Sequence, residues 1–227
     1  MSFKVFIPYI LLIIFASNCL ATTDSVCPIE KKVNIILLHG ASSVGKSTIA
    51  SILRERLDGP YLHIGADNFI AMLPKKYFPG STYEHDGAIF VIENDKNNLP
   101  KVKLKYGAVA IKLFSSIKKI MLDLATDGFP LIIDELILKE EELEEYRQLF
   151  KNFNLITIKV WAPLEVIEKR EKNRGDRKIG LARGMYDEAY QNYKDDLLLD
   201  TSQFSPQECA EKIKNLIEKK QNTNNMY

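Results

Sequence analysis

One stretch of this 227-residue chain has the residue types and spacing of a phosphate-binding loop. Gly40, Gly45, Lys46 and Ser47 fit the pattern G-x-x-x-x-G-K-[ST]. Glycines let the backbone wrap closely around phosphates, and the amides at the start of the following helix hold the anion. The motif therefore predicts binding of a nucleoside triphosphate, with ATP as the expected ligand. The expected contact residues are Gly40, Ala41, Ser42, Ser43, Val44, Gly45, Lys46, Ser47 and Thr48.

Two side chains of this loop and one distant carboxylate are expected to position the triphosphate and Mg²⁺. Lys46 would reach the β- and γ-phosphates, and the Ser47 hydroxyl would bind Mg²⁺. Asp134 follows the apolar run Leu131–Ile133, so it should lie at the carboxyl edge of a buried strand, where open α/β sheets bind ligands. We expect Asp134 to be the second residue on the Mg²⁺ side, with Glu135 as the alternative.

Asp67 ends a second short strand, and two interpretations of it remain open. It could cap the helix that follows, where its side chain would accept a hydrogen bond from a backbone amide. If this strand instead neighbours the first strand at the same sheet edge, the carboxylate faces the γ-phosphate. Asp67 could then take the proton from an acceptor hydroxyl.

Three arginines, Arg170, Arg174 and Arg177, crowd one region around Gly175. A charge run is usually a solvated helix face, and Arg170 and Arg174 are simply four residues apart. Phosphoryl transfer, however, needs cations over the equatorial oxygens of the phosphoryl group. Because Gly175 breaks the helix, the sequence is compatible with a mobile lid that supplies such cations.

These residues must be positioned by alternating strands and helices. Apolar, β-branched runs predict strands, and an apolar period of 3.6 residues predicts helices. Strands are expected at 33–38, 61–64, 131–133, 155–161 and 197–199, with a hairpin of 88–92 and 102–105. Helices are expected at 48–57, 68–73, 106–126, 139–151, 163–174, 179–193 and from 206 onward, where Ser205 and Glu208 form a capping box. His39 and His63 lie in or beside strands and are expected to be packing residues.

This order of elements indicates a single α/β domain on a mostly parallel sheet. The domain is expected over residues 33–220, followed by a polar tail, 221–227, that should fray. Composition agrees with a globular protein, since 46% of residues are hydrophobic and 27% are charged. The 31 basic and 30 acidic residues give a net charge of +1, which is no electrostatic footprint for nucleic acid. We therefore expect no nucleic-acid partner, and the sequence does not indicate an oligomeric state.

The first 21 residues have a different character. They hold one cation, Lys4, then the apolar run 5–16, then small residues up to Ala21. This run is too short for the ~20 residues that span a bilayer, and the order is that of a secretory signal. We expect export with cleavage after Ala21 and no stable membrane insertion. The alternative is an uncleaved anchor that leaves the domain in the cytoplasm.

Cleavage after Ala21 would leave two cysteines, Cys27 and Cys209. In an oxidising compartment they could pair, or they could remain separate thiols. Their spacing does not indicate a zinc site.

Several blocks of this sequence resemble the chloramphenicol phosphotransferase-like kinases. The blocks are 36–47, 61–68, 72–74, 132–135 and 174–182, and their order and spacing agree over about residues 35–212. The resemblance implies a P-loop nucleotide-kinase-like, three-layer fold with a five-stranded sheet. It implies ATP-dependent phosphorylation of a small-molecule hydroxyl, which is chloramphenicol in the founding member. It also implies Asp67 as the general base and Arg174 and Arg177 as lid cations.

The acceptor is the least constrained part of this hypothesis. The segment 75–105 is expected to line the acceptor pocket, but its aromatic residues Phe78, Tyr83 and Phe90 match no motif. A nucleoside, a nucleotide-sugar or a toxin-type acceptor is therefore an alternative. A further alternative is a regulator that binds ATP and transfers nothing.

Overall fold

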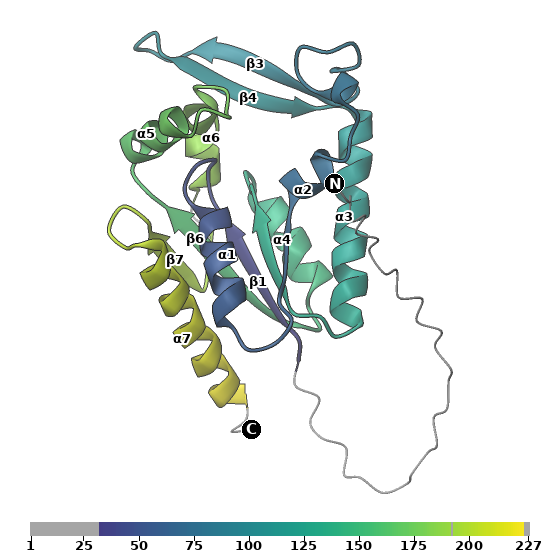
Figure 1. The fold of residues 1–227 in the computed structure, drawn as a ribbon, viewed down its shortest axis with the longest axis vertical. Helices are drawn as coiled ribbons and strands as arrows, with labels where there is room; N and C mark the ends of the chain where they lie inside the picture. The colour runs from purple at the N-terminus through teal and green to yellow at the C-terminus, as the bar shows by residue number, and fades with distance from the viewer. Residues whose placement is uncertain (1–31, 192, 225–227) are drawn as a thin grey trace, which may run out of the picture. The chain divides into compact units, whose positions relative to one another are not determined.

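A central sheet of five parallel strands organises the chain in a computed structural model that describes residues 32–191 and 193–224 (Figure 1). The strand order is β2-β5-β1-β6-β7. The strands are β1 (Asn34–His39), β2 (Leu62–Gly65), β5 (Leu131–Glu135), β6 (Asn154–Trp161) and β7 (Leu197–Asp200). This confirms the predicted fold class. The second strand is not the neighbour of the first, however, because β5 lies between them.

Helices cover both faces of this sheet and complete the three layers. On one face lie α1 (Lys46–Arg56) and α7 (Pro206–Asn224), and on the other lie α3 (Ala108–Thr126) and α4 (Glu140–Leu149). Ile36 and Leu38 of β1 face the first pair, whereas Ile35 and Leu37 face the second. All four are fully buried, and burying each stabilises the fold by about 1.5–3 kcal/mol. Burial on both faces explains why the strand has no polar alternation.

A β-hairpin lies outside the central sheet. It consists of β3 (Ala88–Asn94) and β4 (Pro100–Tyr106) and confirms the predicted hairpin. Figure 1 shows it reaching from the helices α5 (Leu164–Arg174) and α6 (Leu181–Ala189) to the start of α3. Gly184 of α6 lies against β4, where an added Cβ would come within 1.7 Å of the Val102 carbonyl oxygen. Only glycine permits this close approach.

Several predicted boundaries need correction. Tyr106 belongs to β4 and α3 begins two residues later, because the strand pairing continues to the Ala88–Tyr106 register pair. The helix predicted at 179–193 ends at Ala189. The predicted capping box is present, since the Ser205 amide donates to Glu208 Oε2 at 2.8 Å and the Glu208 amide donates to Ser205 Oγ at 3.3 Å. The helix it opens runs to Asn224, so residues 221–224 of the tail predicted to fray are helical.

Predictions about the first 21 residues and Cys27 lie outside the described residues. Cys209 is described: it is buried, and its thiol donates to the Phe204 carbonyl at 3.9 Å. Within the described ranges, no helix combines the length and apolarity needed to cross a membrane.

Candidate active site

The phosphate-binding loop joins β1 to α1 and holds an unusual backbone conformation. Gly40 has φ +144°, Gly45 has φ +107° and Ser43 has φ 63°. A Cβ at Gly40 would lie 2.1 Å from the Val160 carbonyl oxygen, so both the conformation and the available space require glycine. Ser43 is one of two described non-glycine residues with positive φ, and such strain concentrates at functional sites.

Lys46, Ser47 and Asp134 come together at the carboxyl edge of the sheet. Asp134 is the register partner of Leu38 in β1, which places it beside the loop. Ser47 Oγ donates to Asp134 Oδ2 at 2.5 Å, and Lys46 Nζ lies 3.8 Å from Asp134 Oδ1. Lys46 also donates to the carbonyls of Gly40 and Ala41 at 2.9 and 3.1 Å.

The two carboxylates at the end of β5 point to opposite faces of the sheet, as neighbouring strand residues do. Asp134, and not Glu135, is the one bonded to Ser47. Burial would raise the pKa of Asp134, but the charge of Lys46, the nearby His63 and the hydrogen bond from Ser47 outweigh it and lower this pKa. The group is therefore anionic near neutral pH, as a Mg²⁺ ligand must be.

The donors around the loop fit a phosphate chain. The Ile49 amide donates to the Gly45 carbonyl at 3.1 Å, so the amides of Lys46, Ser47 and Thr48 are first-turn donors without an acceptor inside the helix. The Ser43 hydroxyl is buried and has no hydrogen-bond partner among the described residues. No group of three or more His, Cys, Asp or Glu side chains forms a metal cluster in the described ranges. Ser47 and Asp134 would thus share Mg²⁺ with phosphate oxygens and water, the usual arrangement for this ion.

Asp67 lies beside this group and not at a helix cap. Gly65 is the register partner of Asp134, so β2 ends at the same edge. The helix α2 (Ala66–Ile70) contains Asp67 within its first turn and has Gly65 at its N-cap, which makes the capping interpretation wrong. The Asp67 carboxylate instead accepts a hydrogen bond from Arg177 Nη2 at 2.5 Å.

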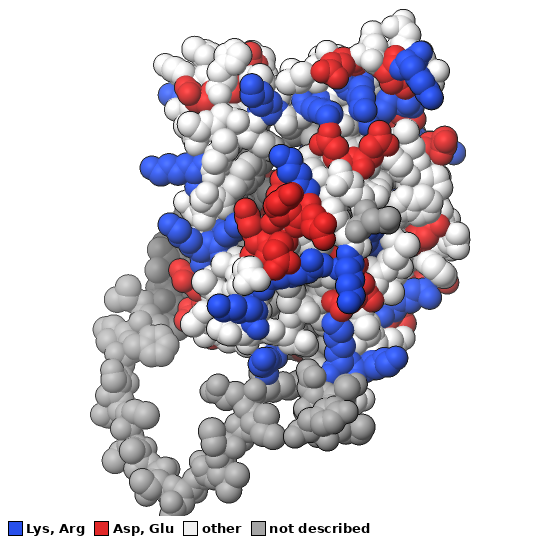
Figure 2. Space-filling model, turned by 180° about the vertical axis from the view of Figure 1, so that it is seen from behind, with Lys and Arg blue, Asp and Glu red and all other residues white. Residues whose placement is uncertain are grey.

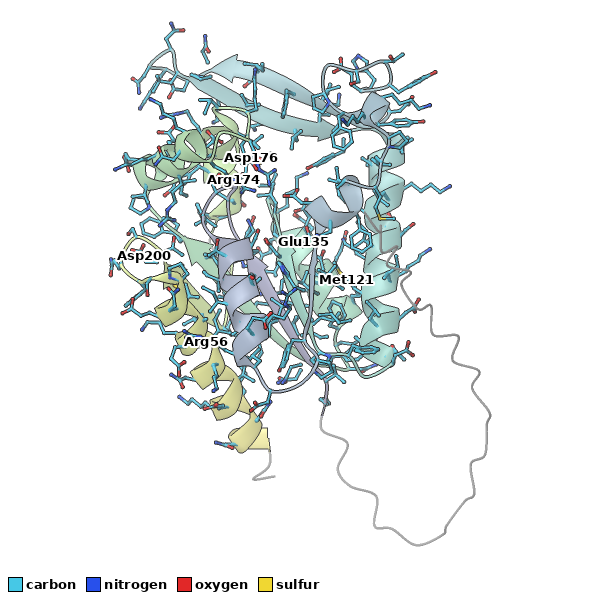
Figure 3. The ribbon with its side chains drawn as sticks, in the orientation of Figure 1. Arg56, Met121, Glu135, Arg174, Asp176 and Asp200 are labelled. Atoms are coloured by element: carbon cyan, nitrogen blue, oxygen red, sulfur yellow. The ribbon has the colours of Figure 1, made fainter. Side chains whose placement is uncertain are left out.

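The three arginines separate into different environments. Arg177 reaches Asp67, whereas Arg174 pairs with Asp176 at 2.8 Å and is 45% exposed (Figure 3). Arg170 faces the phosphate loop, where its Nη1 donates to the Val44 carbonyl at 3.1 Å and to Thr201 Oγ1 at 2.8 Å. Sequence reasoning missed Thr201, because no motif marks a residue whose role depends on tertiary packing.

A cleft of about 1010 Å³ contains all of the predicted catalytic and metal residues. Its far wall, called here the α3 side, consists of residues from β4, α3 and the β5–α4 segment. The apolar and aromatic residues of this wall include Leu104, Tyr106, Ile111, Phe114, Ile117, Leu136 and Tyr146. Of the segment 75–105, expected to line the pocket, only Leu104 does so among the described residues. The sequence feature that could have indicated this wall was the apolar period of α3. That period shows that one face of the helix is buried, but it does not show which neighbouring element the face contacts.

Buried polar groups on the α3 side have shifted pKa values. Burial and the nearby charge of Asp134 raise the pKa of Glu135 to about 7, and Glu135 accepts a hydrogen bond from Tyr146. Figure 3 shows Glu135 at the centre of the molecule, at the end of β5. Burial, then the charges of Asp67 and Glu135, raise the pKa of Tyr106 to about 12. The Tyr106 hydroxyl therefore stays protonated near neutral pH.

Acidic side chains also gather behind this wall. Viewed from behind, Asp and Glu lie together over α4, with Lys and Arg around them (Figure 2). The first turn of this helix holds Glu140, Glu141 and Glu142. Lys118 of α3 forms an ion pair with Glu145 and lies over the Tyr146 ring at 5.1 Å from its centroid.

Both strand histidines contact carboxylates. His39 is fully buried, and its Nε2 lies 2.8 Å from Asp195 Oδ1. His63 lines the cleft, and its Nε2 lies 3.8 Å from Asp134 Oδ2. The expectation of packing alone therefore missed their polar partners.

The parallel sheet, the phosphate loop and the carboxylates at one edge define a P-loop kinase fold. Solved structures with this fold include the APS kinase of Mycobacterium tuberculosis, at TM-score 0.57 and 16% identity over 83% of this chain and 99% of that chain. A gluconokinase from Sinorhizobium meliloti matches at TM-score 0.59 and 12% identity over 87% of this chain and 98% of that one. At these identities the likeness shows the fold alone.

The family follows from the sequence match. Residues 33–218 match the family described as "Chloramphenicol phosphotransferase-like protein", and the chain belongs to this family. Two Mycobacterium tuberculosis strains each have a relative named "Putative O-phosphotransferase", 26% identical over 184 residues, or 79% of this chain and 80% of the relative. The protein is therefore a phosphotransferase of the kinase type.

Proposed function

We propose that this enzyme transfers the γ-phosphoryl group of ATP, with Mg²⁺, to a hydroxyl of a small molecule. The observation that carries the proposal is the position of Asp67 at the same sheet edge as the Ser47–Asp134 pair. A carboxylate there is close to the phosphate-binding residues. The Asp67 side chain does not cap α2, because the N-cap of that helix is Gly65.

Each residue of the edge has a role in this proposal. The loop amides and Lys46 hold the β- and γ-phosphates, and Ser47 and Asp134 hold Mg²⁺. When bound, Mg²⁺ neutralises charge on the phosphate oxygens. Asp67 accepts the proton of the acceptor hydroxyl as the hydroxyl oxygen bonds to the γ-phosphorus, and the bond from that phosphorus to the β–γ bridging oxygen breaks to release ADP. Arg174 and Arg177 stabilise the charge of the transferred group.

The α3 side of the cleft is the proposed acceptor site, and its charges favour an uncharged or amine-bearing alcohol. Its one described cation from α3, Lys118, is already paired with Glu145. Glu135 and Glu142 also line this side and form no ion pair among the described residues. A nucleotide-sugar would bring its phosphates close to the Glu142 carboxylate and to Glu135, which is partly ionised near neutral pH because its pKa is about 7, and this repulsion costs free energy. Chloramphenicol, an uncharged alcohol with an aromatic ring, is one candidate.

Export is a separate part of the proposal. We propose that residues 1–21 direct the chain out of the cytoplasm and are cleaved after Ala21. The support is the order of cation, apolar run and small residues. An exported kinase must meet ATP where it is delivered, such as an ATP-rich host compartment.

An acceptor screen with γ-labelled ATP tests the enzymatic proposal. The acceptors would include chloramphenicol, nucleosides, nucleotide-sugars, amino alcohols and proteins. Asp67→Asn should still bind ATP but lose transfer by on the order of a hundredfold or more. Asp127→Asn is the matched control, because Asp127 is exposed at the far end of α3.

Three outcomes would contradict parts of this proposal. Undiminished transfer by Asp67→Asn would remove Asp67 from the mechanism. A preference for nucleotide-sugars would contradict the charge argument. ATP binding without transfer or hydrolysis would favour a regulator.

A further inference from the structure

Residues outside the phosphate-binding loop hold its first turn against strand β6. The Ala41 amide donates to the Tyr190 hydroxyl at 3.1 Å, and that hydroxyl donates to the Val160 carbonyl at 3.1 Å. The Gly40 Cα faces the same carbonyl so closely that a Cβ would overlap it. Tyr190 therefore bridges the loop and the strand where the loop leaves β1.

A second attachment lies at the middle of the loop. The Val44 carbonyl accepts hydrogen bonds from Thr201 Oγ1 at 2.9 Å and from Arg170 Nη1 at 3.1 Å. Arg170 also donates to Thr201 Oγ1 at 2.8 Å and to the Thr201 carbonyl at 2.7 Å. Thr201 thus both accepts from Arg170 and donates to the loop.

A third attachment lies just before the loop. His39 directly precedes Gly40, and its Nε2 lies 2.8 Å from Asp195 Oδ1. The side chains of His39 and Asp195 are 0% and 5% exposed. Lys159 of β6 lies 3.4 Å from the other oxygen of Asp195. Tyr190, Asp195 and Thr201 belong to the stretch that follows α6, described at residues 190–191 and 193–201 and named here the clamp segment.

The loop needs such support because its backbone is strained. Ser43 at φ 63° and Gly45 at φ +107° lie in the left-handed region, and a strained loop persists only where its surroundings fix it. Binding phosphate with loop amides requires that they already point inward, since ordering them on binding would reduce affinity. An anchored Val44 carbonyl fixes the orientation of the peptide that leads into Gly45.

We propose that Tyr190 and Thr201 are positioning residues for nucleotide binding: they hold the phosphate loop in its binding conformation through the Ala41 amide and the Val44 carbonyl. This inference rests on the proposed use of ATP. The clamp segment follows α6 directly, and Arg170 belongs to the helix that ends at Arg174. The loop is thus attached to α5, which ends at Arg174, and to the segment that follows α6.

Conservative variants separate positioning from general stability. Thr201→Val keeps the shape but removes the hydroxyl, Thr201→Ser restores it, and Tyr190→Phe removes the bridge to Ala41. Tyr186→Phe is the matched control, because Tyr186 lies one turn earlier in α6 and its hydroxyl donates to the Ala162 carbonyl at 3.0 Å instead of the loop. Calorimetric titration with Mg²⁺ and the ATP analogue AMPPNP measures affinity, and amide hydrogen exchange at residues 41–48 measures loop order without nucleotide.

Thr201→Val and Tyr190→Phe should each weaken AMPPNP binding by about tenfold, because Thr201→Val removes one of the two donors to the Val44 carbonyl and Tyr190→Phe leaves the Ala41 amide unpaired. They should raise the KM for ATP and leave kcat within about twofold, since no reacting group changes. Loop amides should exchange faster in both variants, and Thr201→Ser and Tyr186→Phe should resemble the wild type.

If Thr201→Val and Tyr190→Phe both bound AMPPNP as tightly as the wild type and their loop amides exchanged at the wild-type rate, the inference would be overturned. The proposed function would remain intact. A wild-type protein that binds no AMPPNP would overturn the proposed function, and loop exchange would still decide the positioning role. If Thr201→Val fails to fold, the comparison of Tyr190→Phe with its control Tyr186→Phe tests the same inference. A tenfold loss in Tyr186→Phe would also overturn it, because the effect would then not depend on contact with the loop.

Discussion

Arg177 Nη2 and Asp67 Oδ2 lie 2.5 Å apart, although 110 residues separate them in the chain. This contact joins the segment after α5 to the first turn of α2, and both residues line the cleft. It places a fixed cation beside the carboxylate proposed to accept a proton, and it keeps that carboxylate oriented. The burial of Arg177 would lower its pKa, but the hydrogen bond and charge of Asp67 outweigh this and raise it. Arg177 therefore stays charged at any physiological pH.

Arg177 should matter more to transfer than Arg174. Arg177→Ala should lower kcat by on the order of a hundredfold or more, since it removes a cation from the transfer site and frees Asp67. Arg174→Ala should lower it less than about tenfold, because Arg174 is exposed and pairs with a neighbouring surface carboxylate. Steady-state kinetics with an acceptor from the screen measures both. Equal losses in the two variants would contradict the different roles.

Asp134 should control the Mg²⁺ requirement. Asp134→Asn should raise the Mg²⁺ concentration for half-maximal AMPPNP binding by about 10- to 100-fold, as loss of a carboxylate near a bound metal does. Titration of Mg²⁺ at fixed AMPPNP measures this. Asp58→Asn, an exposed turn residue, is the control. An unchanged Mg²⁺ dependence would exclude Asp134 from the metal site.

Gly40 should not tolerate alanine. Gly40→Ala adds a Cβ that overlaps the Val160 carbonyl at 2.1 Å in a glycine-only conformation. We expect AMPPNP affinity to fall by about a hundredfold from displacement of the loop. Gly59 also has a positive φ, +106°, but a Cβ added there would have nothing within 4 Å. Gly59→Ala should therefore lower the free energy of unfolding by about 1–2 kcal/mol and leave AMPPNP binding unchanged. Similar binding losses in both variants would show that backbone conformation alone is responsible.

Asp195 should make stability depend on acid pH. Burial would raise its pKa, but hydrogen bonding and charge from His39, with the charge of Lys159, outweigh this and lower it below its ordinary 3.8. The folded protein then binds fewer protons than the unfolded chain as the pH falls, so this stabilisation is present above pH 3.8 and is lost below it. Asp195→Asn should reduce the free energy of unfolding by about 2 kcal/mol at neutral pH. Denaturation series at several pH values should show this difference shrinking as the pH falls below 3.8, and a constant difference would contradict the mechanism.

The mature protein should begin at Thr22. Cleavage after Ala21 would remove Met1–Ala21 when the chain is produced in a host with a secretory pathway. N-terminal sequencing and intact mass measure the product, and a substitution of Ala21→Arg should block cleavage. Recovery of an intact Met1 from the wild type would support the anchored alternative.

The sequence predicted those site residues whose geometry is set by nearby residues in the chain. The loop, Lys46 and Ser47 were recognisable because their geometry is set within a few residues. Asp134 was predictable because parallel strands end at one edge. Asp67 was ambiguous, since the choice between cap and base depended on where the second strand ends in the sheet and at which residue the following helix begins.

Features that arise from tertiary packing could not be read in this way. The placement of β5 between β1 and β2 follows from chain crossovers that leave no local pattern. Tyr190 and Thr201 contact the loop from 149 and 157 residues away, and neither stands in a motif. The contribution of α3 to the cleft wall was also missed, because the apolar face of a helix does not indicate which element it packs against.

Different stretches of the sequence supply the phosphate loop, the proposed acceptor wall and the arginines. The phosphate loop comes from residues before the second strand, and the arginines and clamp segment come from residues after the sixth. The proposed acceptor wall on the α3 side is encoded between them, from Leu104 to Tyr146. A relative that exchanged only this middle portion but kept Asp67 and Asp134 would retain the proposed nucleotide and Mg²⁺ residues and present a different acceptor wall. Recombination within the family could therefore diversify its substrates without rebuilding the enzyme.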